Sequence, residues 1–343
     1  MSVFIIAEAG VNHNGDEALA LQLVQTAKQC GADAVKFQTF SADKLVRPGA
    51  EKAEYQKRET GSGDQHAMLK ALEMSEALHQ KLFARCAELG IEFMSTPFDE
   101  EAADFLIALG MRRIKIPSGE ITNEPFLEFL AVKDVPLIMS TGMATLAEIQ
   151  RAIKVIASAR IRAGLVAPLD EMLTVLHCTS NYPAQCSDVN LRAMLTIAQK
   201  TGMPVGYSDH TLGLAVSTAA VALGAVVIEK HFTLDRDLAG PDHKASLTPE
   251  QLSQLVSQIR DVGDALGSPI KQPSASELPV RALVRRSVTV VKAVRAGALI
   301  RQDDVALLRP GSGIAPAEMA SVIGRVAAHD LLADTTLQWS DLQ

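Results

Sequence analysis

The sequence has few of the features that mark several large classes of protein. Its 343 residues include only four cysteines, with no CxxC pair and no dense framework of them. The formal net charge of −7 leaves no broad positive field to attract nucleic-acid phosphates. The longest apolar stretch, at 216–228, is too short to span a bilayer, and Glu8 interrupts the N-terminal apolar run, so no signal peptide is indicated. We therefore expect a reduced, cytoplasmic protein that binds neither nucleic acid nor membranes.

Short apolar runs that end in polar residues recur along the chain. The first run, Val3–Ala7, ends at Glu8, and the second, Ala34–Val35, is followed by Lys36 and Gln38. Later runs lie at 91–94, 113–116, 136–139, 173–176, 205–207 and 226–228, with helical periodicity between them. Eight such units predict an α/β fold, a (β/α)8 TIM barrel with its catalytic groups at the C-terminal ends of the strands. A doubly wound sheet shares the alternation but more often has a glycine-rich dinucleotide turn after its first strand, which this chain lacks.

Two segments interrupt the regular alternation. Residues 41–74 form a long polar segment that we predict to be a loop, and loops of this length in compact domains are functional or mobile. Residues 267–279 are rich in Pro and Ser, as in a linker, and the apolar runs beyond them are too short for further strand–helix units. We expect a barrel domain over 1–267, a linker over 268–283, and a small module of short strands and turns over 284–343.

Two histidines stand at the ends of neighbouring predicted strands. Strand alternation places Ser208 and His210 on one face of the seventh strand, and Glu229 and His231 on one face of the eighth. The two imidazoles can therefore point into the same space and hold a divalent ion such as Mn²⁺, with water and substrate completing its shell. Spacing alone leaves open the alternative that one or both rings only donate hydrogen bonds at the rim.

Two lysines lie at strand ends among hydroxyl side chains. Lys36 follows the second apolar run, and Lys115 lies within the fourth. Cationic and hydroxyl groups that converge on one rim suit a phosphate or carboxylate group. A Schiff-base lysine is the alternative, with Lys115 or Lys230 as the candidate. The hydroxyl groups concerned belong to Thr96, Ser118, Ser140 and Ser208.

Carboxylates complete the set of candidate residues. Glu8 and Glu120 are expected to face inward at the first and fourth strands, where either could transfer a proton or bind a sugar hydroxyl. The alternative for each is a carboxylate bonded to structural backbone groups. Asp242 lies on the loop after the eighth strand, within reach of a substrate.

Ordered motifs along the whole chain resemble those of the sialic acid synthase family. The barrel carries IAEAGVNHNG from Ile6, VKFQTF from Val35, STPFD from Ser95, KIPSGE from Lys115, STGM from Ser140, HCTSNYP from His177, GYSDHTLG from Gly206, EKHFT from Glu229 and GPDHKASL from Gly240. In the tail, RRS from Arg285 and LRPGSGI from Leu308 resemble the antifreeze-like (SAF, β-clip) domain of these enzymes.

The resemblance implies a transferase that condenses phosphoenolpyruvate with N-acetylmannosamine. The products would be N-acetylneuraminic acid and phosphate, formed with cleavage of the C–O bond of phosphoenolpyruvate. A divalent metal, Mn²⁺ ahead of Mg²⁺ or Co²⁺, would be held by the residues that match the family's ligands, His210 and His231. A domain-swapped homodimer is also implied, in which Arg309 of the SAF domain reaches the active site of the neighbouring subunit.

Other roles follow from positions that match the family's motifs. Lys36 and Lys115 would hold the anionic end of phosphoenolpyruvate while its C3 attacks the aldehyde of the open-chain sugar, and Glu120 would transfer a proton. Phosphoenolpyruvate would also contact Thr96, Ser118, Ser140, Ser208 and either Ser180 or Asn181, and the sugar would contact Glu8, Gln38, Tyr182 and Asp242.

Other functions stay open at this point. A legionaminic acid synthase would use 2,4-diacetamido-2,4,6-trideoxymannose, and it would differ only in the sugar pocket, at 53–56 and near Tyr182. A pseudaminate synthase fits the long segment at 41–74 less well. A Schiff-base lyase acting on sialic acid would be trapped by borohydride in the presence of pyruvate, and chelators would not change its activity. A surface-binding or carbohydrate-binding protein without catalysis would not need a complete polar rim.

Overall fold

The computed structural model describes residues 3–343 and separates into two units. The first is Met1–Gly267 and the second is Ser268–Gln343. Each unit has its own core of buried apolar side chains. No helix formed by the described residues is long and apolar enough to cross a bilayer.

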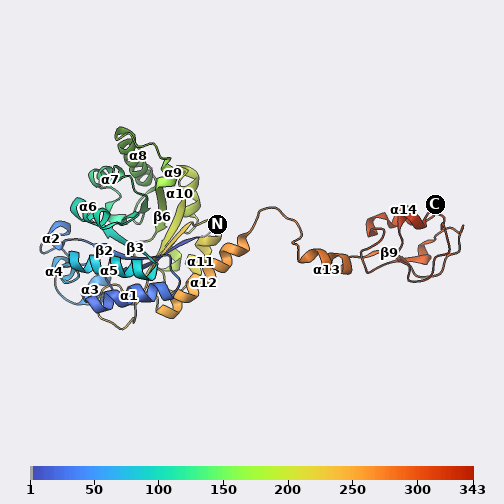
Figure 1. The fold of residues 1–343 in the computed structure, drawn as a ribbon, viewed down its shortest axis with the longest axis horizontal. Helices are drawn as coiled ribbons and strands as arrows, with labels where there is room; N and C mark the ends of the chain where they lie inside the picture. The colour runs from blue at the N-terminus through green and yellow to red at the C-terminus, as the bar shows by residue number, and fades with distance from the viewer. Residues whose placement is uncertain (1–2) are drawn as a thin grey trace. The chain divides into compact units, whose positions relative to one another are not determined.

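Eight parallel strands form one sheet in the first unit (Figure 1). Their order, β3-β2-β1-β8-β7-β6-β5-β4, places consecutive strands side by side and joins β1 to β8, so the predicted (β/α)8 barrel is confirmed. The strands are β1 (Phe4–Gly10), β2 (Ala34–Thr39), β3 (Glu92–Pro97), β4 (Ile114–Ile116), β5 (Leu137–Ser140), β6 (Leu173–Cys178), β7 (Val205–Asp209) and β8 (Val227–His231).

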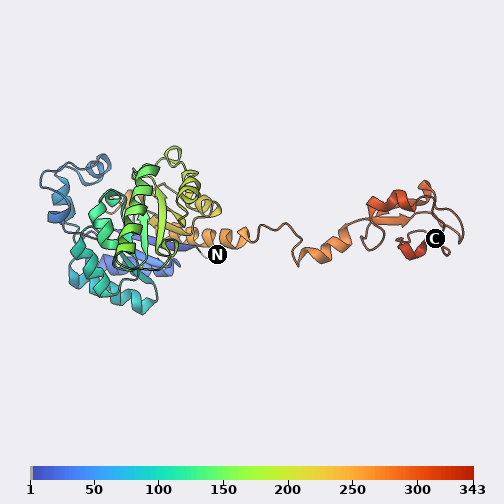
Figure 2. The same cartoon turned by 90° about the horizontal axis from the view of Figure 1, so that it is seen from above.

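Helices cover the outside of this sheet (Figures 1 and 2). In α12 (Pro249–Leu266), the hydroxyl of Thr248 accepts a hydrogen bond from Gln251 N, and apolar residues at three- and four-residue spacing are buried. Local capping and one buried apolar face therefore define α12. The others are α1 (Glu17–Gln29), α5 (Glu76–Leu89), α6 (Glu100–Leu109), α7 (Glu124–Ala131), α8 (Leu146–Arg162), α9 (Leu169–Met172), α10 (Ala193–Thr201) and α11 (Ala215–Ala222).

The register between strands brings polar residues side by side. Glu8 in β1 is opposite Lys36 in β2 and His231 in β8, while Ser208 in β7 is opposite Glu229 in β8. Side chains at matching register in a parallel sheet point to the same face. These five side chains therefore share the interior of the barrel, and they belong to the strands themselves rather than following them.

Side chains close the barrel between β3 and β4. Among the residues of 3–343, no backbone ladder pairs these two strands. Ser95 N in β3 donates instead to the Met111 sulfur at 3.2 Å, and the Arg113 guanidinium binds Glu92 through two contacts of 2.6 and 3.0 Å. This line of contact is called the β3–β4 seam below.

The polar segment at 41–74 is a folded insert, not the loop that we predicted. Each of its helices spans seven residues or fewer, too short for a helical period to be visible in the sequence. The helices are α2 (Ala42–Leu45), α3 (Glu54–Thr60) and α4 (Gln65–Lys70). Apolar side chains of α2 and α4 pack against a small cluster formed by Val11, Phe40 and Leu72.

A buried lysine organises the turn between α3 and α4. Lys52 Nζ donates to Thr60 Oγ1 at 2.9 Å, to Gly61 O at 3.3 Å and to Ser62 O at 3.4 Å. Its side chain is buried, and the three oxygens that accept its hydrogen bonds are all neutral. The insert is therefore a fixed part of the barrel rim.

The second unit is built on one antiparallel pair of strands, β9 (Ser287–Val290) and β10 (Val305–Leu308). Ten buried apolar side chains form its core, which is small. The segment predicted as a linker contains α13 (Glu277–Val284), because Pro279 falls in the first turn, where its missing N–H is not needed. The remaining short helices are η4 (Gln302–Asp304), η5 (Pro316–Glu318), α14 (Met319–Val322) and η6 (Trp339–Asp341).

Candidate active site

A cavity of about 540 Å³ opens among the carboxyl ends of the barrel strands. Its inner part is lined by buried polar side chains of the strands, and its outer part by residues of the insert and of the loops. Most of the predicted site residues line this one cavity. They are Glu8, Lys36, Gln38, Thr96, Lys115, Ser118, Glu120, Ser140, Ser180, Tyr182, Ser208, His210 and His231.

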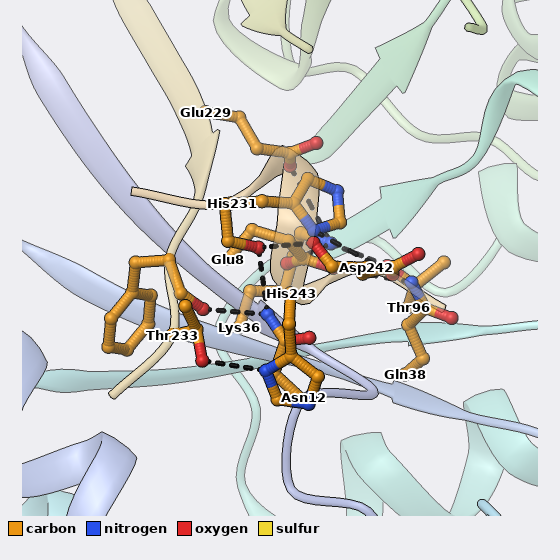
Figure 3. A network of polar contacts seen from close by, with 12 residues as sticks. Glu8, Asn12, Lys36, Gln38, Thr96, Glu229, His231, Thr233, Asp242 and His243 are labelled. Atoms are coloured by element: carbon orange, nitrogen blue, oxygen red, sulfur yellow. Dashed lines mark hydrogen bonds and ion pairs between the residues drawn. The ribbon is translucent and has the colours of Figure 1, made fainter. Parts of the chain in front are cut away.

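Two lysines and two carboxylates form an ion-pair network at the inner end of the cavity, and Figure 3 shows Glu8, Lys36 and Glu229 of this network. Lys36 Nζ lies 2.6 Å from Glu8 Oε2 and 3.6 Å from Glu229 Oε2. Lys115 Nζ lies 3.2 Å from Glu229 Oε1, which also accepts a hydrogen bond from Ser208 Oγ at 2.8 Å. Because all four charged side chains are buried, each depends on its neighbours for compensation.

The two carboxyl groups of this network titrate differently. Burial raises the pKa of Glu8 to about 7, and the attraction of Lys36 does not outweigh it. Burial would also raise the pKa of Glu229, but Lys115 and Lys36 together outweigh it and hold that pKa well below its usual range. Neighbouring carboxyls with separated pKa values are suited to different tasks, one as a proton carrier and the other as a fixed anion.

His210 and His231 lie together, with their ring centroids 5.5 Å apart. His210 Nδ1 donates to Thr179 O at 2.7 Å, which fixes the tautomer and leaves the lone pair on Nε2. Burial lowers the pKa of His210 to about 4 and that of His231 well below its usual value. Both rings are therefore neutral at pH 7, the form that binds a metal.

The donor set fits a divalent metal ion with open positions. Among residues 3–343, His231 Nδ1 is buried without a hydrogen-bond partner, and His210 Nε2 has none either. Within the part of the chain that the structure describes, no group of three or more His, Cys, Asp and Glu side chains has metal-binding geometry. Water and substrate oxygens would have to complete the shell, as in catalytic rather than structural metal sites.

Unsatisfied donors on the lysine side of the cavity favour an anionic ligand. Ser140 Oγ is buried and has no hydrogen-bond partner within the described part of the chain. Among the described residues, Lys115 Nζ contacts only Glu229 Oε1, so N–H donors remain for a ligand. Lys36 Nζ donates to Thr96 Oγ1 at 2.9 Å, which holds the second ammonium at the same wall. Buried polar groups without partners in a cavity indicate a polar ligand.

Hydrogen bonds join the loop after β1 to the loop after β8 (Figure 3). Asn12 Nδ2 donates to Ser246 Oγ at 2.9 Å, and Ser246 Oγ donates to Asp242 O at 2.7 Å. Asp242 Oδ2 then lies 3.8 Å from His231 Nδ1. Burial raises the pKa of Asp242 to about 6. The network therefore fixes a titratable carboxyl beside the second histidine.

Aromatic rings line one side of the outer cavity. The Tyr182 ring lies 4.1 Å from the His210 ring and 5.6 Å from the His231 ring, between centroids. The ring of Tyr55, from α3 of the insert, lies 5.1 Å from the Tyr182 ring, again between centroids. The insert thus reaches the two histidines through one intervening ring.

Some predicted site residues do not stand where the sequence placed them. Glu120 is in the short helix η1 (Ser118–Glu120), beyond β4 and not at the strand end, and its carboxylate accepts a hydrogen bond from Asn123 at 2.7 Å. Asn181 is exposed and outside the cavity wall, so Ser180 is the residue of that pair that faces the cavity. Asp242 is buried behind the wall, and Arg309 is an exposed residue of the second unit.

Sequence reasoning did not select Glu229, although it lies between both lysines. Its position two residues before His231 places it on the same strand face, which is a signal that the sequence contains. The prediction of an anion site from lysines and hydroxyl groups did not consider that buried lysines need a buried counter-charge.

Comparison with known proteins gives domain matches, related enzymes and a similar crystal structure. Residues 23–271 match the NeuB family, and residues 285–343 match the SAF domain. The N,N'-diacetyllegionaminic acid synthase of Legionella pneumophila is 55% identical, over 100% of this chain and 95% of that protein. The enzyme of the same name from Campylobacter jejuni is 43% identical, over 97% and 98%. The crystal structure of the N-acetylneuraminic acid synthetase of Leptospira borgpetersenii, in complex with citrate, is similar with a TM-score of 0.71 and 34% identity, over 82% and 90%.

Proposed function

The chain belongs to the NeuB family, and on that basis we propose that it condenses phosphoenolpyruvate with 2,4-diacetamido-2,4,6-trideoxymannose. One water molecule is consumed by addition to C2 of phosphoenolpyruvate, and the products are N,N'-diacetyllegionaminic acid and phosphate. N-acetylmannosamine, the sugar that the sequence put first, becomes the second candidate. The order changes because two relatives at 55% and 43% identity are N,N'-diacetyllegionaminic acid synthases.

The observation that carries this proposal is the meeting of two buried lysines and two neutral histidines in one cavity. The lysine side suits the phosphate and carboxylate of phosphoenolpyruvate, since Lys115 and Ser140 keep donors free. The histidine side suits the oxygen of a sugar aldehyde. A divalent metal ion held by His210 and His231, with Mn²⁺ as the first candidate, supplies Lewis acidity for the charge that develops on that oxygen.

The chain's own residues bind, orient and move a proton. Lys36 and Lys115 hold the anion, and ion pairs with Glu229 keep both lysine side chains in place. We assign proton transfer to Glu8 in preference to Glu120. Glu8 is buried beside Lys36 with a pKa of about 7, near the working pH, whereas Glu120 is partly exposed and bonded to Asn123.

A Schiff-base reaction has less support. Lys230 lies outside the cavity wall, and its Nζ pairs with Asp209 Oδ2 at 2.8 Å and donates to Thr211 O at 2.6 Å. Lys115 stands in the cavity, but its Nζ is engaged in an ion pair with Glu229 Oε1 at 3.2 Å, whereas a Schiff base needs an amine that is free to attack a carbonyl.

The SAF domain and the assembly belong to the same proposal. A homodimer is proposed in which Arg309 of one chain binds the sugar in the barrel of the other, as the family resemblance implies. Arg309→Ala should then raise the KM of the sugar several-fold and leave the KM of phosphoenolpyruvate unchanged. Light scattering should give the mass of two chains. An unchanged sugar KM would remove the role of Arg309.

The decisive experiment measures phosphate release from phosphoenolpyruvate with each candidate sugar. Chelator-stripped protein is assayed with and without Mn²⁺. Metal-dependent release that is faster with 2,4-diacetamido-2,4,6-trideoxymannose supports the proposal. Faster release with N-acetylmannosamine would move the chain to sialic acid synthesis, and no release with either sugar would refute both.

His231→Ala tests the role of the histidine pair. Metal-dependent phosphate release should disappear, and the affinity for Mn²⁺ measured by calorimetry should fall with it, because one of two protein ligands is lost. A matched control is His329→Ala, which removes an exposed histidine of the second unit. Retained Mn²⁺ binding in His231→Ala would contradict the two-histidine site.

A further inference from the structure

The wall that the insert contributes to the cavity differs in chemistry from the rest. The charged residues of the cavity come from the barrel strands and from η1. The insert residues that line the cavity are all uncharged, namely Leu45, Val46, Ala53, Tyr55, Gln56, Gln65 and Leu69. Phe40 and Phe98 extend this apolar wall at the ends of β2 and β3. A ligand therefore meets charge at the inner end of the cavity and apolar surface at the outer end.

Tyr55 is the largest side chain on this wall. Its ring lies 5.1 Å from the Tyr182 ring at an interplanar angle of 31°, and the ring is half-buried. Gln56 lies beside it, where its Oε1 accepts hydrogen bonds from Ala53 N at 3.0 Å and Gln65 Nε2 at 3.3 Å. The wall thus combines an aromatic face with side-chain amides.

The position of Tyr55 is fixed before any ligand binds. Gln56 caps the start of α3, and Lys52 ties the end of the same helix through Thr60 and Gly61. A helix held at both ends presents its side chains at defined positions. Pre-organisation of this kind gives a binding wall its selectivity.

We propose that Tyr55 is a specificity-determining residue, whose ring and apolar neighbours receive the C4–C6 end of the sugar and select a 6-deoxy sugar with a second acetamido group. The inference rests on the proposed condensation. The aldehyde carbon must lie at the inner end, beside the histidines and the lysines. The far end of the open-chain sugar then extends toward the outer, apolar wall.

The chemistry of the two candidate sugars separates at this wall. N-acetylmannosamine carries hydroxyl groups at C4 and C6, which lose hydrogen bonds to water against Leu69, Phe40 and Phe98. The diacetamido sugar carries a methyl group at C6 and an acetamido group at C4. The methyl groups pack on the aromatic and aliphatic side chains, and the amides of Gln56 and Gln65 can bond the acetamido group. Small apolar differences of this kind change kcat/KM by about 10- to 200-fold.

The test compares kcat/KM for phosphate release with both sugars in four proteins, namely the wild type, Tyr55→Ala, Tyr55→Phe and Glu54→Ala. Tyr55→Ala should lower kcat/KM for the diacetamido sugar about tenfold or more, mainly through KM, and change that for N-acetylmannosamine far less. Tyr55→Phe should retain most of the preference, because the ring is kept. Glu54→Ala should match the wild type, since Glu54 is 90% exposed on the same helix and points away from the cavity wall.

The outcomes separate this inference from the proposed function. If the wild type releases phosphate and Tyr55→Ala slows both sugars equally, Tyr55 only supports Tyr182 and His210, and the inference is overturned while the function stands. An unchanged ratio with unchanged rates overturns it as well. No release by the wild type with either sugar overturns the function itself. A melting curve and the KM of phosphoenolpyruvate, both expected to be unchanged in Tyr55→Ala, show whether the variant keeps its fold.

Discussion

Glu8 and Glu229 are both buried beside Lys36, yet only one of them changes its charge near neutral pH. The difference lies in the number of cations that each faces. Glu229 lies within reach of two ammonium groups and one hydroxyl donor, whereas Glu8 has Lys36 and a contact of 3.4 Å from Gln38. A carboxyl that can be neutral or charged at the working pH can give and take a proton during one reaction cycle.

The raised pKa of Glu8 predicts a pH-dependent term in stability. The folded-state pKa is about 7, above the usual value of 4.5, so the folded protein binds a proton that the unfolded chain releases between these values. This contribution is complete below the unfolded pKa and is lost as pH rises through the folded pKa. Each unit of difference corresponds to about 1.4 kcal/mol. Urea unfolding across this window should show the wild type losing stability with rising pH relative to Glu8→Gln.

The comparison with Glu8→Gln isolates this one group. Asp242, whose pKa is also raised, and the buried histidines, whose pKa values are lowered, titrate in both proteins and cancel in the difference. Parallel pH profiles for the two proteins would show that Glu8 is ionised throughout, and would remove the basis for its role as the proton carrier.

At the scale of elements, the insert shows how one buried side chain can hold several turns. Lys52 satisfies two backbone carbonyls and one hydroxyl between α3 and α4. Lys52→Met keeps the length of the side chain and removes all three hydrogen bonds. Leaving such groups unpaired costs about 1–3 kcal/mol.

That cost should fall on the insert and not on the barrel. We expect limited proteolysis of Lys52→Met to cut within 51–64 several times faster than in the wild type, with little change in the melting temperature of the barrel. Lys57→Met is the matched control, because Lys57 is 43% exposed and its ion pairs are with exposed glutamates. Equal cleavage rates in the three proteins would show that the insert is held by its apolar cluster alone.

The sequence predicted the repeated elements well and the irregular ones poorly. Alternating apolar runs and helical periodicity predicted the barrel. Each strand–helix unit buries its apolar face in the same way, so the same sequence pattern recurs. The ends of these runs did not mark the ends of the strands. Lys36 and Glu229 are polar, yet they still belong to the strand ladders. In α13 and in the insert, Pro279 and the short helices left no period to detect.

The candidate site was predictable where a residue faces the cavity by strand alternation. Lys36, Ser208 and His231 are of this kind. Residues on loops and short helices follow no such rule. Glu120 and Asn181 lie beyond strand ends, and only the path of the backbone decides where their side chains lie.

At the scale of the whole molecule, each of the two units has a core of its own. A protein that ends at Gly267 should therefore fold, with a melting temperature within a few degrees of the barrel transition in the full chain. It should also bind Mn²⁺ as the full chain does, because His210 and His231 belong to the first unit. Calorimetry of both proteins checks this. Aggregation or loss of the barrel transition would show that the second unit is needed for folding.

The β3–β4 seam has a consequence for how the barrel responds to an anion. Thr96 stands on one side of it, beside Lys36, while Lys115 and Ser118 stand on the other. An anion bound by residues on both sides would link β3 to β4, two strands between which the described residues form no backbone ladder. Hydrogen–deuterium exchange should therefore show the amides of β3 and β4 as the least protected of the barrel strands without ligand, and as the most slowed when phosphoenolpyruvate is added. The exchange rate of the amides along the β3–β4 seam would then report whether the anion site is occupied.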